Sequence, residues 1–214
     1  MKKHTLETTK TGRYYTLGTL SDSTKEIVFV FHGYGELAKE FIQNFETIKS
    51  EQRFIIALEA LNKFYFRGFS GKIGASWMTR EDRENEITDY LKFCDNLYSQ
   101  YSNQISPITK ITLFGFSQGG ATASRWFVNS VLPNSRLVLW GSSIPPDIDY
   151  NTLREKLFSK VTIVIGDQDE FISEDSIKDE VERLHKMNID FELKKYPGNH
   201  KIQPGLFKKL NLFY

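Results

Sequence analysis

Cysteine is nearly absent from this sequence: Cys94 is the only one in 214 residues. A single thiol excludes an intrachain disulfide and a cysteine-based zinc site. Long apolar runs are also missing, and none approaches the roughly 18–20 residues that a membrane-spanning helix requires. We therefore expect no stable insertion into a membrane. No metal-binding motif is present either, and we expect neither a metal nor a cofactor.

An excess of either charge is lacking as well. The 28 Lys and Arg residues nearly balance the 27 Asp and Glu residues, which leaves a net charge of +1. Binding to nucleic acid or to an anionic membrane usually needs a clustered basic excess, so neither is an expected partner. Residues 1–5 are basic, but no apolar run follows them as it would in a secretory signal. This pattern predicts a cytoplasmic protein.

What the sequence does contain is a series of short apolar runs, each followed by a turn and then by a helix-like pattern. The runs are β-branched or aromatic and nearly continuous, as expected for strands that are covered on both faces. They are Ile27–Phe31, Phe54–Leu58, Ile111–Phe116, Leu137–Trp140 and Val161–Ile165, with a more alternating sixth at Phe191–Tyr196. Arg13–Leu17 is a candidate for an additional antiparallel strand.

Helices are predicted between and after these strands, at Glu36–Lys49, Arg83–Tyr101, Gln118–Val131, Glu174–Met187 and Ile202–Leu210. Thr79 and Asp82 have the spacing of a capping box before the second of them. Strands that alternate with helices form a parallel sheet with helices on both faces, so we predict one α/β domain over residues 1–214. Ligands bind beyond the carboxyl ends of the strands in such sheets.

The third apolar run leads into Gly115-Phe116-Ser117-Gln118-Gly119, which fits the pattern Gly-x-Ser-x-Gly. A serine hydroxyl is a weak nucleophile and must stand exposed beside a base. A sharp turn from strand to helix presents the hydroxyl in this way, and the flanking glycines let neighbouring backbone pass without a clash. The pattern therefore predicts Ser117 as a nucleophile.

A nucleophilic serine needs a base, and the sequence has four histidines. In this class of sheet the acid and the base follow the serine along the chain, which leaves His185 and His200. His185 falls within a predicted helix, whereas His200 lies in the loop directly after the last strand and is the predicted base. Asp167 and Asp169 compete as the orienting acid. Asp169 is favoured, because an aspartate as near a strand end as Asp167 often bonds its own backbone in a turn.

The tetrahedral oxyanion formed on attack needs two backbone N–H donors. One belongs to the residue after the nucleophile, Gln118. The second should come from the loop after an earlier strand, and the glycine-flanked turn His32-Gly33-Tyr34-Gly35-Glu36 follows the first run directly. We therefore predict that the N–H groups of Tyr34 and Gln118 form an oxyanion hole.

The first glycine loop also has a second interpretation. Gly33-Tyr34-Gly35-Glu36-Leu37-Ala38 fits the dinucleotide-binding pattern G-x-G-x-x-G/A, and Glu59 ends the next strand where an acid would meet a ribose. A dinucleotide-binding oxidoreductase leaves Ser117, Asp169 and His200 unexplained, whereas a hydrolase accounts for both glycine loops.

Five segments together resemble the phospholipase/carboxylesterase family of α/β-hydrolases, which includes acyl-protein thioesterases. They are His32-Gly33-Tyr34-Gly35, Ala75-Ser76-Trp77, Gly115-Phe116-Ser117-Gln118-Gly119-Gly120, Gly166-Asp167-Gln168-Asp169 and Gly198-Asn199-His200. The resemblance covers nearly the whole chain and implies an α/β-hydrolase fold. It also implies a triad of Ser117, Asp169 and His200, with the oxyanion hole at Tyr34 and Gln118.

The segment Leu61–Thr79 is long and aromatic, and we expect a loop that forms one wall of a substrate cleft. Trp77 and Phe66 are the candidates for substrate contact on this wall, with Ile144 opposite. The chain has no room for a large cap domain, so the cleft should be open and should suit small or medium acyl groups.

These features predict a serine hydrolase that cleaves carboxylic esters or thioesters through an acyl-enzyme, with a small-molecule ester or an acylated group as its partner. An alternative keeps the fold but lacks turnover and acts as a small-molecule binding module. The sequence leaves the oligomeric state open, a homodimer included.

Overall fold

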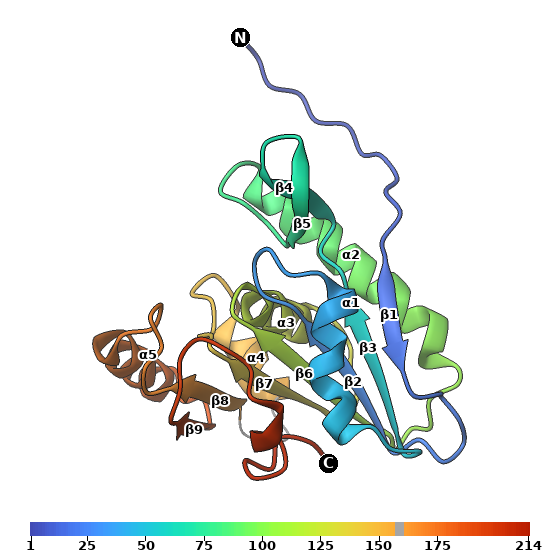
Figure 1. Ribbon diagram of the computed structural model, residues 1–214, viewed down its shortest axis with the longest axis vertical. Helices are drawn as coiled ribbons and strands as arrows, with labels where there is room; N and C mark the ends of the chain where they lie inside the picture. The colour runs from blue at the N-terminus through green and yellow to red at the C-terminus, as the bar shows by residue number, and fades with distance from the viewer. Residues whose placement is uncertain (157–160) are drawn as a thin grey trace.

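A seven-stranded sheet forms the centre of the computed structural model, which describes residues 1–156 and 161–214. The strand order is β1-β3-β2-β6-β7-β8-β9, as Figure 1 shows. Six strands run parallel, and β1 pairs antiparallel with β3 at one edge. The seven predicted strands are confirmed, with the bounds Tyr14–Leu17 (β1), Glu26–Phe31 (β2), Arg53–Leu58 (β3), Lys110–Phe116 (β6), Ser135–Trp140 (β7), Val161–Gly166 (β8) and Phe191–Tyr196 (β9).

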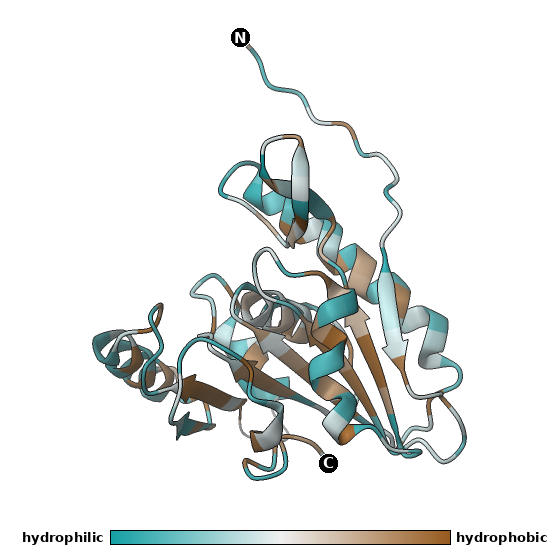
Figure 2. Cartoon of the chain, viewed as in Figure 1, coloured by the Kyte–Doolittle hydropathy of each residue, from teal (hydrophilic) through white to brown (hydrophobic). Residues whose placement is uncertain are grey.

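Both faces of the sheet are covered by apolar side chains, because successive residues of a strand point to opposite faces. In β2, Ile27, Phe29 and Phe31 pack on one face, while Val28 and Val30 pack on the other. The first face is covered by α2 (Arg83–Ser102), α3 (Gln118–Asn129), α4 (Tyr150–Lys156) and α5 (Glu174–Lys186). The second is covered by α1 (Ala38–Phe41), η1 (Ile42–Ile48) and the carboxyl-terminal segment with η2 (Pro204–Leu206). Figure 2 shows the apolar residues concentrated in the strands. The predicted α/β architecture is confirmed.

Three helix predictions need correction. The segment predicted as one helix over residues 36–49 is a single α-helical turn followed by a 3-10 helix, and residues 202–210 contain only the short η2 and turns. The capping box before α2 is absent: Asp82 is the cap residue, with φ at 50° and no side-chain capping bond. Thr79 donates instead to the Glu86 carboxylate in the first turn of the helix.

The aromatic segment after β3 is a hairpin, not a loop. Strands β4 (Asn62–Arg67) and β5 (Ser70–Ser76) pair antiparallel as a separate two-stranded sheet. This hairpin projects beyond the carboxyl ends of the central strands (Figure 1). Its alternation was obscured in the sequence because aromatic residues 64–66 occupy both of its faces. Within the part of the chain that the structure describes, no helix combines the length and apolar character needed to cross a bilayer.

A partly buried ion network joins α2, α3 and the loop before α4. Arg125, only 4% exposed, donates to both carboxylate oxygens of Asp147 at 2.9 and 3.0 Å and to the Tyr90 hydroxyl at 3.2 Å. Arg83 donates to the same carboxylate at 2.7 Å. Burial opposes ionisation of Asp147, but these hydrogen bonds outweigh it and lower the pKa of Asp147 from 3.8 to about 2. The network therefore contributes stability that is present above pH 3.8 and is lost as the pH falls through about 2.

We expect Asp147→Ala to lower the free energy of unfolding by about 2–3 kcal/mol at pH 7, because it leaves the Arg125 guanidinium buried and unpaired. The loss should shrink as the pH approaches 2 in urea-unfolding curves. Asp89→Ala, on the exposed face of α2, is the matched control and should change little. An equal loss for both variants would contradict the role of the network.

Candidate active site

Ser117 occupies the sharp turn between β6 and α3. Its φ of 51° and ψ of −121° lie outside the regions that L-residues favour, at a cost on the order of 1–3 kcal/mol. The packing around the turn holds this conformation. A Cβ at Gly119 would lie 2.2 Å from the carbonyl oxygen of Phe31, so only glycine lets α3 approach β2 this closely. Ser117 is half-buried, as a serine presented at the edge of a sheet would be.

The imidazole of His200 and the carboxylate of Asp169 form a hydrogen bond in the loops after β9 and β8. His200 Nδ1 lies 2.7 Å from Asp169 Oδ2, and the Asp169 side chain is fully buried. The other oxygen of Asp169 accepts the N–H groups of Phe171 and Ile172 at 2.9 and 3.1 Å. Because an ionised carboxylate only accepts, Nδ1 carries a proton and Nε2 is free to act as a base. The structure thus brings Asp169 to His200, while Asp167 accepts the Gly198 N–H at 3.0 Å.

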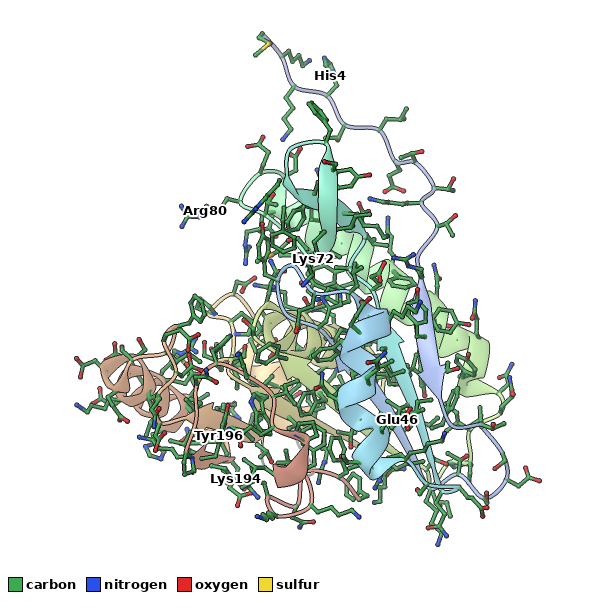
Figure 3. All side chains as sticks on the ribbon, in the orientation of Figure 1. His4, Glu46, Lys72, Arg80, Lys194 and Tyr196 are labelled. Atoms are coloured by element: carbon green, nitrogen blue, oxygen red, sulfur yellow. The ribbon has the colours of Figure 1, made fainter. Side chains whose placement is uncertain are left out.

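The loop that carries His200 is held by the hydroxyl of Tyr196, at the end of β9 (Figure 3). This hydroxyl lies 2.8 Å from the carbonyl oxygens of both Asn199 and Lys201. The indole N–H of Trp140 donates to the same hydroxyl at 3.1 Å. The residues on either side of His200 are therefore fixed to the core of the sheet.

His200 lies beside the turn that carries Ser117. Its ring centroid is 5.0 Å from that of Phe116, and a Cβ at Gly141 would lie 2.9 Å from Cε1 of His200. The carbonyl of Trp140, the residue before Gly141, accepts the Ser117 N–H at 3.0 Å. Among the described residues no hydrogen bond joins the Ser117 hydroxyl to the imidazole, an arrangement common in sites without substrate, where such bonds tighten on binding.

The start of α3 packs against the loop after β2, because a Cβ at Gly119 would lie within 2.6 Å of the carbonyl oxygens of Phe31 and His32. Gln118 is the first residue of α3, so its N–H has no acceptor within the helix. The Gln118 side chain accepts the Trp77 N–H at 3.0 Å and donates to the Met78 carbonyl at 2.8 Å, which ties the start of α3 to the end of β5. The Trp77 indole in turn donates to the carbonyl of His32 at 2.8 Å.

His32 is fully buried beneath this loop. Its Nδ1 donates to the carbonyl of Gly33 at 2.7 Å, and its Nε2 accepts the Ala60 N–H at 3.0 Å. Burial lowers the pKa of His32 from 6.5 to about 4, so the ring is neutral at pH 7 and supports the loop as one fixed tautomer.

A sequence model described as Phospholipase/Carboxylesterase matches residues 19–214. The chain belongs to this family. The resemblance predicted from five short segments is therefore confirmed over nearly the whole chain. A search of curated proteins found no match.

Solved structures show the fold of the phospholipase/carboxylesterase family in this chain. Esterase PE8 superimposes with a TM-score of 0.67 at 21% identity, over 96% of this chain and 100% of its own. Acyl-protein thioesterase 2 from Zea mays gives 0.66 at 18% identity, over 94% and 96%. A phospholipase/carboxylesterase from Dyadobacter fermentans gives 0.64 at 18% identity, over 96% and 97%.

The three residues predicted to contact substrate differ in their exposure to solvent. Trp77 and Ile144 are 1% and 0% exposed, and both belong to the core. The indole N–H of Trp77 donates to the carbonyl of His32 at 2.8 Å, and both side chains lie within the core, so neither lines an open cleft. Phe66 is 48% exposed on the hairpin, with its ring against Gly35, and is available to a substrate.

Glu59 is not available as the acidic residue that the dinucleotide-binding interpretation requires. The Glu59 side chain is buried and binds the guanidinium of Arg13, while it accepts the Ala38 N–H at 3.3 Å. The sheet also differs, because the strand beyond β3 is β1, which runs antiparallel and precedes β2 in the chain, whereas a dinucleotide-binding sheet has a third parallel strand at that place. Within residues 1–156 and 161–214 no group of three His, Cys, Asp or Glu side chains is arranged to hold a metal ion.

We expect the pH dependence of stability to report the buried state of His32. Its lowered pKa stabilises the fold fully above pH 6.5, and this contribution is lost as the pH falls through about 4. The loss amounts to about 3 kcal/mol at roughly 1.4 kcal/mol per pKa unit.

The measurement is urea unfolding between pH 4 and pH 7. His32→Gln should unfold more easily than wild type at pH 7 but should show a shallower pH slope. His185→Gln, at an exposed histidine, should keep the wild-type slope. Parallel slopes for all three proteins would contradict a neutral His32.

Proposed function

We propose that the protein hydrolyses carboxylic esters or thioesters through a triad of Ser117, His200 and Asp169. The observation that carries this proposal is the 2.7 Å bond between Asp169 and His200 beside the strained turn at Ser117. This bond sets the imidazole tautomer that accepts a proton at Nε2, which is the state a serine nucleophile needs. Family membership supports ester hydrolysis as the general reaction.

The reaction proceeds in two halves. The Ser117 hydroxyl attacks the acyl carbonyl and transfers its proton to Nε2 of His200, and the proton then passes to the departing alcohol or thiol. His200 next takes a proton from water, which attacks the acyl-enzyme and releases the acid while Ser117 regains its hydrogen. Asp169 stays ionised throughout and stabilises the imidazolium.

Both tetrahedral intermediates place a negative charge on the former carbonyl oxygen. The N–H groups of Tyr34 and Gln118 are the proposed donors, and losing one such donor costs roughly 3–4 kcal/mol of transition-state stabilisation. The positive end of the α3 dipole lies at the same point. No cofactor enters the proposed steps, and the cytoplasmic location remains a prediction of the sequence.

An aromatic shelf formed by Tyr34, Phe64 and Phe66 supports a substrate with a small or medium acyl group. The rings of Tyr34 and Phe64 stack at 5.2 Å, and those of Phe64 and Phe66 lie 5.2 Å apart. Tyr34 and Phe66 are 58% and 48% exposed beside the proposed oxyanion donor. Hydrocarbon placed on these rings would leave water without entering a deep channel.

We expect Ser117→Ala to lose both turnover of p-nitrophenyl esters and covalent labelling by a fluorophosphonate, with the label of wild type mapped to Ser117 by mass spectrometry. Asp169→Asn should lower kcat by roughly 10⁴, as loss of the triad carboxylate does in serine proteases. Ser70→Ala and Asp167→Asn are matched controls on the hairpin and beside the acid, and both should remain active. Wild-type protein that neither labels nor turns over any ester or thioester would instead support a binding module.

The shelf predicts a chain-length effect. Phe66→Ala should lower kcat/KM for an octanoate ester about 5-fold, corresponding to about 1 kcal/mol of lost apolar contact, and should leave the acetate ester nearly unchanged. Phe69→Ala removes a ring that is 100% exposed at the hairpin turn and should affect neither ester. Equal losses for both esters would mean that Phe66 does not contact the acyl chain.

A further inference from the structure

We propose that Glu36 is a positioning residue of the oxyanion hole, whose carboxylate fixes the Gly33 backbone so that the N–H of Tyr34 stays free for the reacting oxygen. The inference rests on the proposed function, because it assigns a role within the same site. Neither the Gly-x-Ser-x-Gly pattern nor the search for a base draws attention to this side chain.

The carboxylate of Glu36 binds the loop directly. Its Oε2 accepts the Gly33 N–H at 2.7 Å. A Cβ at Gly33 would lie 3.1 Å from the same oxygen, so glycine permits the close approach. The carbonyl of Gly33 accepts from His32 Nδ1 at 2.7 Å and from the Glu36 N–H at 3.3 Å. Both backbone polar groups of Gly33 are thus occupied, and its carbonyl belongs to the same peptide unit as the Tyr34 N–H.

Four successive amides of this loop show a selective pattern. The N–H of Gly33 donates to the Glu36 carboxylate, that of Gly35 to the Ala75 carbonyl at 2.8 Å, and that of Glu36 to the Gly33 carbonyl. Only the N–H of Tyr34 has no acceptor within the part of the chain that the structure describes. A loop amide left unpaired between paired neighbours is ready for a ligand oxygen, and here it is the predicted oxyanion donor.

Two groups that can carry a positive charge lie near Glu36. Lys72 comes from β5, where the hairpin meets the loop (Figure 3), and His200 comes from the carboxyl-terminal loop. Burial raises the pKa of Glu36, while the Gly33 N–H and these two groups favour its ionised form. The geometry holds the Glu36 carboxylate against Gly33, and its ionised form would stabilise the imidazolium when His200 accepts a proton.

The test compares two substitutions at residue 36 in the full chain. Glu36→Gln keeps an oxygen that can accept the Gly33 N–H, whereas Glu36→Met has a similar length and no such oxygen. We expect Glu36→Met to lower kcat on a soluble p-nitrophenyl ester about 10- to 100-fold, part of the roughly 10²–10³ lost with a whole donor. Its KM should stay within about 2-fold of wild type, and Glu36→Gln should recover most of kcat. Glu40→Met and Glu40→Gln, at an exposed residue of α1, are the matched controls.

A second readout separates positioning from a merely structural role. A trifluoromethyl ketone adds to the nucleophile and forms an oxyanion that occupies the hole, so its inhibition constant should rise in Glu36→Met by the same factor as kcat/KM falls. A variant that is only less folded would lose active protein without this parallel change. If Glu36→Met does not fold, amide hydrogen exchange in wild type decides, with Gly33 expected to exchange at least about 10-fold more slowly than Tyr34.

The outcomes distinguish a failure of the Glu36 proposal from a failure of the proposed function. Wild-type turnover with unchanged kcat in Glu36→Met overturns the inference and leaves the triad intact, as does equal exchange of the two amides. Equal losses in Glu36→Gln and Glu36→Met also overturn it, because the acceptor oxygen would then not matter. Wild-type protein without turnover or labelling at Ser117 means that the proposed function itself fails.

Discussion

The parallel register of β6 between β2 and β7 is the constraint on which the site depends. Gly115 in β6 pairs with Phe31 on one side and Leu139 on the other, so the three strands end at the same level. The turn at Ser117 therefore begins beside the loop that follows β2 and beside the last carbonyl of β7. On the far side of the sheet, Gly166 and Tyr196 are also paired, so the loops after β8 and β9 start level with one another. Segments far apart along the chain meet because backbone hydrogen bonds align the strand ends.

Polar groups beneath these loops are buried, and their hydrogen-bond partners determine which donors and acceptors are left for a substrate. His32 is kept neutral, and its two nitrogens are used by Gly33 and Ala60. The carboxylate of Asp169 accepts hydrogen bonds from two backbone amides and one imidazole. Because an unsatisfied buried polar group costs about 1–3 kcal/mol, such saturation restricts the loops to one arrangement. Among the residues that the structure describes, Nε2 of His200 and the N–H of Tyr34 are left without a partner, and both are groups that the proposed mechanism uses.

Much of this arrangement could be predicted because it follows local rules. The strands were recognisable from continuous apolar runs, and Ser117, Asp169 and His200 from their places after strand ends. The hairpin was not predicted because its aromatic residues lie on both faces and hide the alternation of a strand. The burial of Trp77 was not predicted for a related reason, since a large aromatic residue in a sequence does not reveal whether its indole N–H has a buried acceptor. Similarly, nothing local to Glu36 shows that its carboxylate bends back to Gly33.

The hairpin is joined to the loop after β2 by two backbone hydrogen bonds, from Gly35 to Ala75 and from Ala75 to Glu36. The strand pair that carries the proposed acyl-binding rings is thus hydrogen-bonded to the loop whose N–H group would donate to the oxyanion. Remodelling the hairpin to accept another substrate would also shift these peptide units. In the proposed mechanism selectivity and turnover would therefore be coupled, and a grafted hairpin would have to keep both hydrogen bonds of Ala75 to leave the loop after β2 in place.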